Sequence, residues 1–169
     1  LGSPSEPTTK ALRKYLRKFL GDPRVIDINP WLWKIILNFF VLPFRPKKSA
    51  KLYARIWDGK SFPLITNTRD FTNNVREELK KIDLDGHVEV NHAFLLSPPY
   101  VNEVYDSWEN DLKKGIGATK LLVIPMFPQY SESTIASGID ALAKELSKRV
   151  KIPTFEVITN FHRTHAFID

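Results

Sequence analysis

The hydrophobic pattern of the chain alternates between short, dense apolar runs and longer segments with helical spacing. Four runs predict strands, near residues 63–66, 88–94, 121–124 and 155–158. Helical spacing appears between or beside them, at 71–82, 101–112 and 135–146. Strands separated by single helices indicate right-handed βαβ units. We therefore expect a single α/β domain over residues 1–169, with a doubly wound, four-stranded parallel sheet flanked by helices.

The segment 120–146 is the one around which we expect the domain to be organised. Leu121–Ile124 is short and apolar enough for a strand buried on both faces. Pro125 and Pro128 then prevent both strand pairing and helix, so the chain must leave the sheet. The polar turn 129–134 follows at the carboxyl end of the strand, which is where open parallel sheets usually bind ligands. A plain connection rich in turn formers is the alternative.

Residues 30–44 form the most apolar stretch, interrupted by Lys34 and Asn38. Asn29 before Pro30 is a good helix start. The 15 residues are fewer than the ~20 that span a bilayer. Such a helix is either buried or lies at a pocket mouth or membrane interface, and its two tryptophans beside a lysine favour the interface.

A cationic helix start follows this apolar stretch. Arg45, Lys47 and Lys48 crowd the first turn of a helix expected over 45–57. The positive end of the helix dipole makes each of them unfavourable there by ~0.3–1 kcal/mol. A sequence that accepts this cost usually binds an anion at the same place.

Charge is distributed unevenly along the chain. Residues 1–60 contain 13 Lys and Arg against 4 Asp and Glu, whereas residues 61–169 contain 12 against 15. The basic front section suggests an anionic partner such as nucleic acid, a membrane surface or a ligand with carboxylates or phosphates, and a solvated basic face is the alternative. The aromatic residues there have core-face spacing rather than that of a stacking platform, so we expect no nucleic acid partner.

Familiar catalytic motifs are missing from the sequence. The chain has no cysteine, which excludes disulfides, thiolate metal sites and a cysteine nucleophile within it. Gly-rich phosphate loops, His-Glu-x-x-His and Gly-x-Ser-x-Gly are also absent. The four histidines lack metal-ligand spacing, and we interpret them as structural. No signal peptide is visible, so a cytoplasmic location is the default expectation.

Several motifs together resemble ferrochelatase, in the order and near the spacing of that family. They are Leu1-Gly2-Ser3-Pro4 with Pro7-Thr8, Phe19-Leu20-x-Asp22-Pro23-Arg24-Val25, Leu42-Pro43-Phe44-Arg45-Pro46-Lys47-Lys48-Ser49-Ala50-x-x-Tyr53 and Pro128-Gln129-Tyr130-Ser131-x-Ser133-Thr134. The resemblance covers the whole chain and corresponds to the amino-terminal half of the family. It implies one of two doubly wound domains that face each other across a cleft, where Fe(II) is inserted into protoporphyrin IX to form protohaem.

The resemblance also implies roles for particular residues. Segment 30–44 is similar to the lip that covers the flat porphyrin and rests against a membrane, which would place the enzyme peripherally at the inner membrane. Contacts to the porphyrin propionates match Arg45, Lys48, Tyr53 and Ser61, and the floor of the cleft matches Tyr130, Ser131, Thr134 and the loop at Gly2-Ser3-Pro4. Iron and porphyrin are substrates, and no cofactor or metal is expected to be held by this chain.

The sequence departs from the family pattern at several positions. Leu95-Leu96 aligns with a usual Arg-Tyr, Phe62 interrupts a usual Gly-Ser-Pro-Leu, and Ile135-Ala136 stands where Thr-Gly is frequent. The family's catalytic His and Glu lie beyond the equivalent of Asp169, and one of its strands lies before Leu1. We therefore expect no catalytic residue in this chain, and a carboxy-terminal chelatase domain as its partner. The alternatives are a half-size chelatase that forms its cleft by homodimerising, and a non-catalytic porphyrin- or haem-binding module at a membrane surface.

Overall fold

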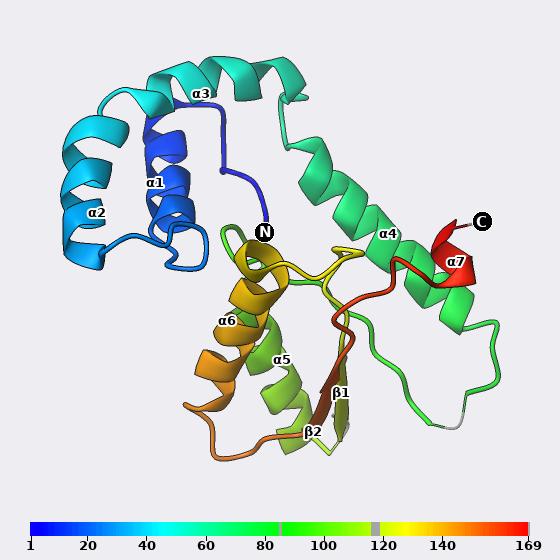
Figure 1. The fold of residues 1–169 in the computed structure, drawn as a ribbon. Helices are drawn as coiled ribbons and strands as arrows, with labels where there is room; N and C mark the ends of the chain where they lie inside the picture. The colour runs from blue at the N-terminus through cyan, green and yellow to red at the C-terminus, as the bar shows by residue number, and fades with distance from the viewer. Residues whose placement is uncertain (85, 116–118, 169) are drawn as a thin grey trace.

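The computed structural model of the chain describes residues 1–84, 86–115 and 119–168. Helices and a small parallel sheet make up these ranges (Figure 1). The elements in chain order are α1 (Thr9–Leu20), α2 (Pro30–Ile36), the π-helical turn η1 (Leu37–Val41), α3 (Arg45–Tyr53), the short 3-10 helix η2 (Ala54–Ile56), α4 (Pro63–Leu79), α5 (Val101–Lys113), β1 (Lys120–Val123), the π-helical turn η3 (Glu132–Ala136), α6 (Ser137–Leu146), β2 (Thr154–Val157) and α7 (His165–Ile168). The α/β class is confirmed.

Strands β1 and β2 pair in parallel, with Leu121 opposite Phe155 and Val123 opposite Val157. The connection between them contains α6, which packs with α5 on one face of the sheet. Tyr105, Leu142 and Leu146 form the buried centre of this packing. Leu121 and Val123 point into it, whereas Leu122 on the other face is half-exposed. The expectation of a strand buried on both faces is therefore wrong for this chain.

Two of the four expected strands do not form in the described residues. Residues 63–66 are the first turn of α4, because Pro63 fits the start of a helix and the Ile65 amide bonds to the Phe62 carbonyl (N–O 2.9 Å). Residues 88–94 have no strand ladder, and Phe94 forms a single isolated bridge with Tyr100. The sheet thus has two strands where four were expected.

The front of the chain folds as a separate helical cluster. Leu16 and Leu20 of α1 pack with Leu37 and Leu42 from the end of the apolar stretch. Helix α3 lies across α1, with the rings of Tyr15 and Tyr53 in contact. Asn29 caps the start of α2, as the sequence predicts, and Gly21 caps the end of α1.

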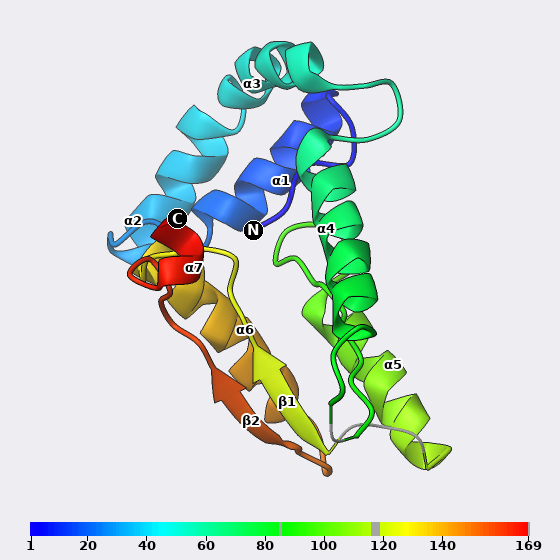
Figure 2. The ribbon, with the colours of Figure 1, turned by 90° about the vertical axis from the view of Figure 1, so that its right-hand side faces the viewer.

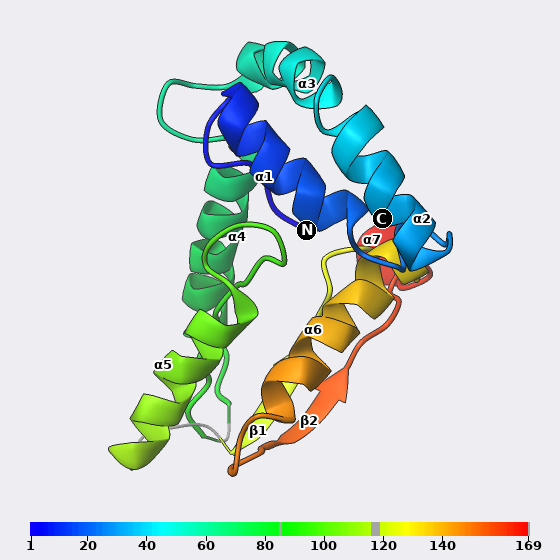
Figure 3. The ribbon, with the colours of Figure 1, turned by 90° about the vertical axis from the view of Figure 1, so that its left-hand side faces the viewer.

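The helical cluster lies beyond the carboxyl ends of both strands, which point toward α1 and α2 (Figures 2 and 3). The loop between β1 and η3 therefore emerges on the side of the sheet that faces the helical cluster. The polar turn thus follows the carboxyl end of β1, as the sequence predicts.

Candidate functional site

A shallow hollow of about 460 Å³ brings cations and aromatic rings together at the junction of η1 and α3. Phe40, Val41 and Phe44 line one part of it, and Arg45 and Lys48 the other. Phe40 and Phe44 are 67% and 71% exposed, so their rings face solvent rather than the core. The hollow joins the predicted lip to the predicted anion site.

The local fold explains why these side chains point outward. Leu37 and Leu42 are buried against α1 and hold the π-helical turn in place. The Leu42 amide donates to the Leu37 carbonyl (N–O 2.9 Å), which closes this wide turn. Residues 38–40 between the two anchors and residues 43–44 after them then face solvent, whereas Val41 packs against the buried cluster. The stretch 30–44 therefore buries one side against α1 and exposes the other side to solvent.

The first turn of α3 contains no acidic residue. Arg45, Lys47 and Lys48 are exposed, and no ion pair in the described ranges involves them. Pro46 is fully buried and fixes the start of the helix. Unneutralised cations at the positive end of a helix dipole are the electrostatic arrangement that an anionic group would stabilise.

Tyr53 lies at the other end of α3, in an aromatic cluster. Its ring lies 6.2 Å from Tyr15 and meets Phe62 edge to face at 5.5 Å, both between centroids. The Tyr15 hydroxyl donates to the Gly2 carbonyl (O–O 3.3 Å), so the cluster reaches the N-terminal loop. Burial, with Tyr53 next to it, raises the pKa of Tyr15 well above its ordinary value. Tyr53 does not line the hollow with Arg45 and Lys48.

Ser61 ends a tight turn that begins at Asp58. The amides of Lys60 and Ser61 donate to the Asp58 carboxylate, at 2.7 and 2.6 Å, and these bonds lower the pKa of Asp58. The Ser61 side chain is half-buried and donates to the Phe62 carbonyl (O–O 3.3 Å). Phe62, one of the departures from the family pattern, is buried between Tyr53 and Trp57.

The polar turn after β1 brings together three other predicted residues. The hydroxyls of Ser131 and Thr134 hydrogen-bond each other, and the Ile135 amide donates to the Ser131 carbonyl (N–O 3.0 Å). Ile135 is fully buried and anchors the turn, whereas Tyr130 at its edge is half-exposed. The Pro128 carbonyl accepts from the amides of residues 161 and 162, which joins the loops leaving both strands.

The predicted site residues thus form separate groups: Arg45 with Lys48, Tyr53 with the N-terminal loop, and Ser131 with Thr134 beside Tyr130. No hydrogen bond or ion pair within the described residues links the first group to the last. Sequence reasoning missed the pair that bridges the helical cluster and the polar turn, Arg24 with Asp140. Their separation of 116 residues left no local signal, although Arg24 belongs to one of the motifs.

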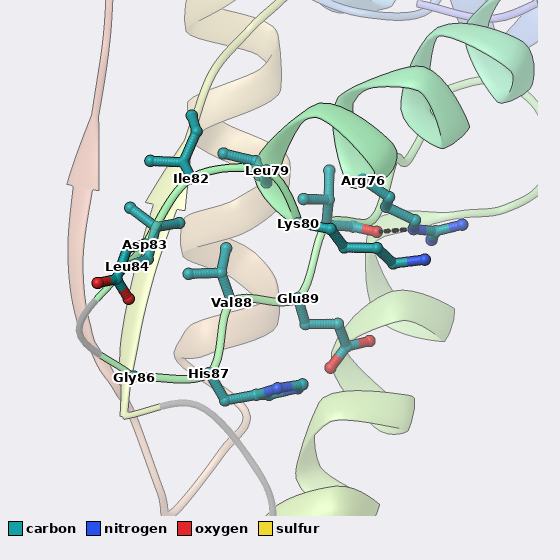
Figure 4. A pocket seen from close by; sticks show the side chains of 11 residues that line it. Arg76, Leu79, Lys80, Ile82, Asp83, Leu84, Gly86, His87, Val88 and Glu89 are labelled. Atoms are coloured by element: carbon teal, nitrogen blue, oxygen red, sulfur yellow. Dashed lines mark hydrogen bonds between the residues drawn. The ribbon is translucent and has the colours of Figure 1, made fainter.

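A second hollow, of about 410 Å³, lies between the end of α4 and residues 82–90 (Figure 4). Leu79, Ile82 and Val88 give it an apolar wall, and Arg76 closes one side by donating to the Val90 carbonyl (N–O 2.7 Å). It contains none of the predicted site residues. Within the parts of the chain that the structure covers, no group of three His, Asp or Glu could hold a metal, and no helix is long and apolar enough to cross a membrane.

Comparison with known proteins gives one consistent family. The family model described as Ferrochelatase matches residues 1–169. The chain is 42% identical to Ferrochelatase of Idiomarina loihiensis and 38% identical to that of Marinobacter nauticus, in each case over the whole chain and 45% and 44% of the relative. It is 37% identical to Coproporphyrin III ferrochelatase of Streptococcus mutans, over 99% of the chain and 50% of the relative. The chain therefore spans about half the length of the curated relatives that it matches.

Proposed function

This chain belongs to the ferrochelatase family, and we propose that it forms one wall of the porphyrin cleft in a longer enzyme that inserts Fe(II) into protoporphyrin IX. The observation that carries the proposal is the hollow at the junction of η1 and α3, where Phe40 and Phe44 adjoin Arg45 and Lys48. A planar aromatic ring with carboxylates on one edge needs both an apolar surface and cations beside it. The hollow supplies both.

The proposed roles follow from the chemistry of these side chains. Arg45 and Lys48 bind the propionates, because charge-assisted bonds to carboxylates are about twice as strong as neutral ones. The guanidinium of Arg45 presents donors in a fork that matches a carboxylate, whereas Lys48 acts as a compact charge. Phe40 and Phe44 pack against the macrocycle. Tyr130, Ser131 and Thr134 form the polar floor, and Tyr53 and Ser61 support the propionate end.

Proton transfer from the pyrrole nitrogens is not assigned to residues of this chain. We propose that a carboxy-terminal chelatase domain provides the His and Glu for that step, together with the facing wall. The relatives are about twice as long as the chain, which supports an additional region. The part of the mechanism that belongs here is to bind and orient the porphyrin, with iron as the second substrate.

A wider sheet in the longer protein is part of the same proposal. The Leu1 carbonyl accepts a bond from the Leu96 amide (N–O 2.9 Å), and the Ser3 amide bonds to Ser97 Oγ at 3.3 Å. These bonds place the N-terminal loop against the end of the 88–96 segment. We propose that a preceding strand lies along residues 88–94 and that these two join β1 and β2 in a four-stranded, doubly wound sheet, with the preceding strand in place of the one expected at 63–66.

Peripheral membrane contact is a second function that a specific feature supports. Trp31, Phe39, Phe40 and Phe44 are exposed on one helical segment, within a front section that is strongly basic. An exposed apolar surface next to cations suits the surface of an anionic bilayer, from which a poorly soluble porphyrin could be taken up. We propose this surface as the contact with the cytoplasmic side of the inner membrane.

The test is porphyrin binding by the full-length protein that contains this chain. We expect Arg45→Ala to weaken protoporphyrin IX binding about ten-fold, followed by fluorescence quenching, because one charge-assisted carboxylate contact is lost. Lys14→Ala on α1 is the matched control and should change affinity little. Equal losses for the two variants would contradict the proposed anion site.

The same assay tests the alternatives. Coproporphyrin III should be run beside protoporphyrin IX, since one relative carries that name. Residues 1–169 alone should bind porphyrin without catalytic haem formation. Turnover by this chain together with a dimeric mass in sedimentation would favour a homodimeric half-size chelatase instead.

A further inference from the structure

Hydrogen bonds, a cation–π contact and an ion pair join the helical cluster α1–α3 to the sheet with α5 and α6. The N-terminal loop links Tyr15 to the end of the 88–97 segment through the Gly2 carbonyl and Ser97. The ammonium of Lys18 lies over the ring of Tyr100, 4.6 Å from its centroid. Both of these links lie near the start of α5. A further link, between Arg24 and Asp140, reaches α6 just after the polar turn.

Arg24 and Asp140 form a two-pronged ion pair. Nε of Arg24 lies 2.6 Å from Oδ2 of Asp140, and Nη2 lies 3.1 Å from Oδ1. Two parallel bonds fix the orientation of both groups as well as their separation. The side chains are 36% and 42% exposed, so solvent screening leaves the pair little to contribute to folding stability. Its geometric effect is the larger one.

The turn that presents Arg24 is held on both sides. Oδ1 of Asp22 accepts from the Arg24 amide (N–O 2.9 Å), and the Asp22 carbonyl accepts from the Val25 and Ile26 amides at 3.0 and 3.1 Å. Val25 and Ile26 pack against the buried cluster of Leu16, Leu20, Leu37 and Leu42. Movement of Arg24 is therefore coupled to the core that also supports the apolar lip.

The other end of the pair lies beside the polar turn. Asp140 belongs to the first turn of α6, which continues directly from η3 and Thr134. Asp140 raises the pKa of the Arg24 guanidinium above its ordinary value. The charges of Glu132 and the Tyr130 phenol add a smaller electrostatic effect in the same direction. Arg24 thus lies at the edge of the turn that carries Tyr130, Ser131 and Thr134.

We propose that Arg24 is a positioning residue: its ion pair with Asp140 sets the separation between the lip at 30–44 and the polar turn at 130–134, and so the fit of a planar porphyrin between them. The effect on porphyrin fit rests on the proposed function. The effect on the separation of lip and turn rests on the ion pair alone. Loss of the pair leaves the links near α5 in place, so the lip gains freedom to pivot about them.

The geometric part is tested by distance measurement in the full-length protein. Spin labels at Asn38→Cys and Gln129→Cys, both exposed positions, report the separation of lip and turn, with any cysteines outside this chain replaced first. We expect one narrow distance distribution, which Arg24→Gln and Asp140→Asn each broaden or shift. Arg13→Gln on the outer face of α1 should leave it unchanged. An Arg24→Gln distribution identical to that of the parent would overturn the proposal.

The functional part is tested by the kinetics of the same variants. Arg24→Gln and Asp140→Asn should each raise the porphyrin KM about two- to five-fold, the range that a half-exposed ion pair can supply, with kcat and Tm close to those of Arg13→Gln. The double variant should resemble either single one, and Arg24→Asp with Asp140→Arg should recover part of the loss. Additive losses, or losses that follow Tm, would indicate a merely structural pair.

These outcomes separate the two ideas. A parent protein that binds no porphyrin while its label distances still respond to Arg24→Gln would refute the proposed function and leave the geometric role of the pair intact. A parent that binds porphyrin and is indifferent to both substitutions would refute this inference and leave the proposed function intact.

Discussion

The indole Nε1 of Trp33 donates a hydrogen bond to the carbonyl oxygen of Leu20, with 2.6 Å between nitrogen and oxygen. The bond satisfies a carbonyl at the end of α1 that has no partner within the helix. It also fixes α2 against α1, so that Trp33 faces inward and Trp31 faces solvent. The one-sided presentation of the apolar lip depends on this contact.

Replacing Trp33 by Phe should therefore destabilise the protein. The aromatic ring is kept, but the Leu20 carbonyl loses its donor in a half-buried place, and we expect the free energy of unfolding to fall by about 1–2 kcal/mol. Trp31→Phe is the matched control, with an expected change within about 0.5 kcal/mol, as for other surface substitutions. Urea unfolding of both variants measures the difference, and similar values for the two would show that the bond to Leu20 contributes little.

Gly2 and Gly59 offer a second matched pair, since both have positive φ angles, +107° and +96°. A Cβ at Gly59 would meet nothing within 4 Å, whereas one at Gly2 would lie 2.3 Å from Ser97 Oγ. Gly59→Ala should cost about 1 kcal/mol from backbone strain alone. Gly2→Ala should cost about 2–4 kcal/mol, because it also displaces Ser97.

Denaturant unfolding of the two alanine variants checks this difference. Adding Ser97→Ala to Gly2→Ala should recover part of the lost stability, since the nearest atom is removed. Equal costs at Gly2 and Gly59 would mean that the N-terminal loop is not held against residues 94–97 in solution.

The sequence predicts the elements whose signals are local and agree with one another. Helix α5 follows the apolar spacing of 101–112 and ends at Lys113, two residues before Gly115, whose φ of +78° favours glycine. Strands β1 and β2 also form where dense apolar runs predict them. Gly115 follows the helix and Pro125 follows β1, and both residue types interrupt regular structure.

Residues 63–66 show why the other predictions failed. Ile65 is β-branched and favours a strand, but Pro63 is at a helix start, and the helical pattern of 71–82 extends backward to include it. The extended segment at 88–94 lacks a neighbouring strand among the described residues, so its apolar pattern cannot give a ladder. In both places the surrounding structure, rather than the strand propensity of the residues, decides the conformation.

The candidate site likewise has one part that the sequence predicts and one part that it does not. The hollow beside Arg45 and Lys48 follows from a contiguous sequence, since the apolar stretch and the cationic turn are adjacent in the chain. The ion pair of Arg24 with Asp140 joins residues far apart, and charge patterning cannot select one acidic partner among many. Spatial bridges of this kind require coordinates.

The environment of His92 predicts a pH dependence of stability. The Thr72 hydroxyl donates to the Thr68 carbonyl (O–O 2.8 Å), so its oxygen accepts a hydrogen bond from Nδ1–H of His92 (O–N 3.0 Å), which neutral imidazole can donate. Burial, and secondarily the charge of Arg76, lowers the pKa of His92 below its ordinary 6.5. The unfolded chain therefore binds a proton before the folded one as the pH falls.

Stability linked to His92 should then be complete above pH 6.5 and be lost as the pH falls through 6.5 toward the lower folded-state pKa. His92→Gln should flatten the unfolding free energy between pH 7 and about pH 5 relative to the parent. His87→Gln is the control, because His87 is exposed, and it should keep the parental slope. An unchanged slope in His92→Gln would assign the dependence to other groups.

The exposed face of the lip gives the last prediction. Trp31 and Phe39 are 77% and 70% exposed and lie outside the residues that line the hollow, so they can be changed without removing that surface. Each aromatic side chain that enters a bilayer interface removes apolar area from water, at roughly 25 cal/mol per Å². Trp31→Ser with Phe39→Ser should therefore reduce vesicle affinity of the full-length protein by at least about ten-fold. Val150→Ser is the control, since Val150 is 99% exposed but lies in the connection between α6 and β2.

Flotation with phosphatidylglycerol vesicles should separate the two variants, and raising the salt concentration should weaken binding further by screening the basic front section. Equal flotation of the double variant and Val150→Ser would show that the lip is not the membrane contact.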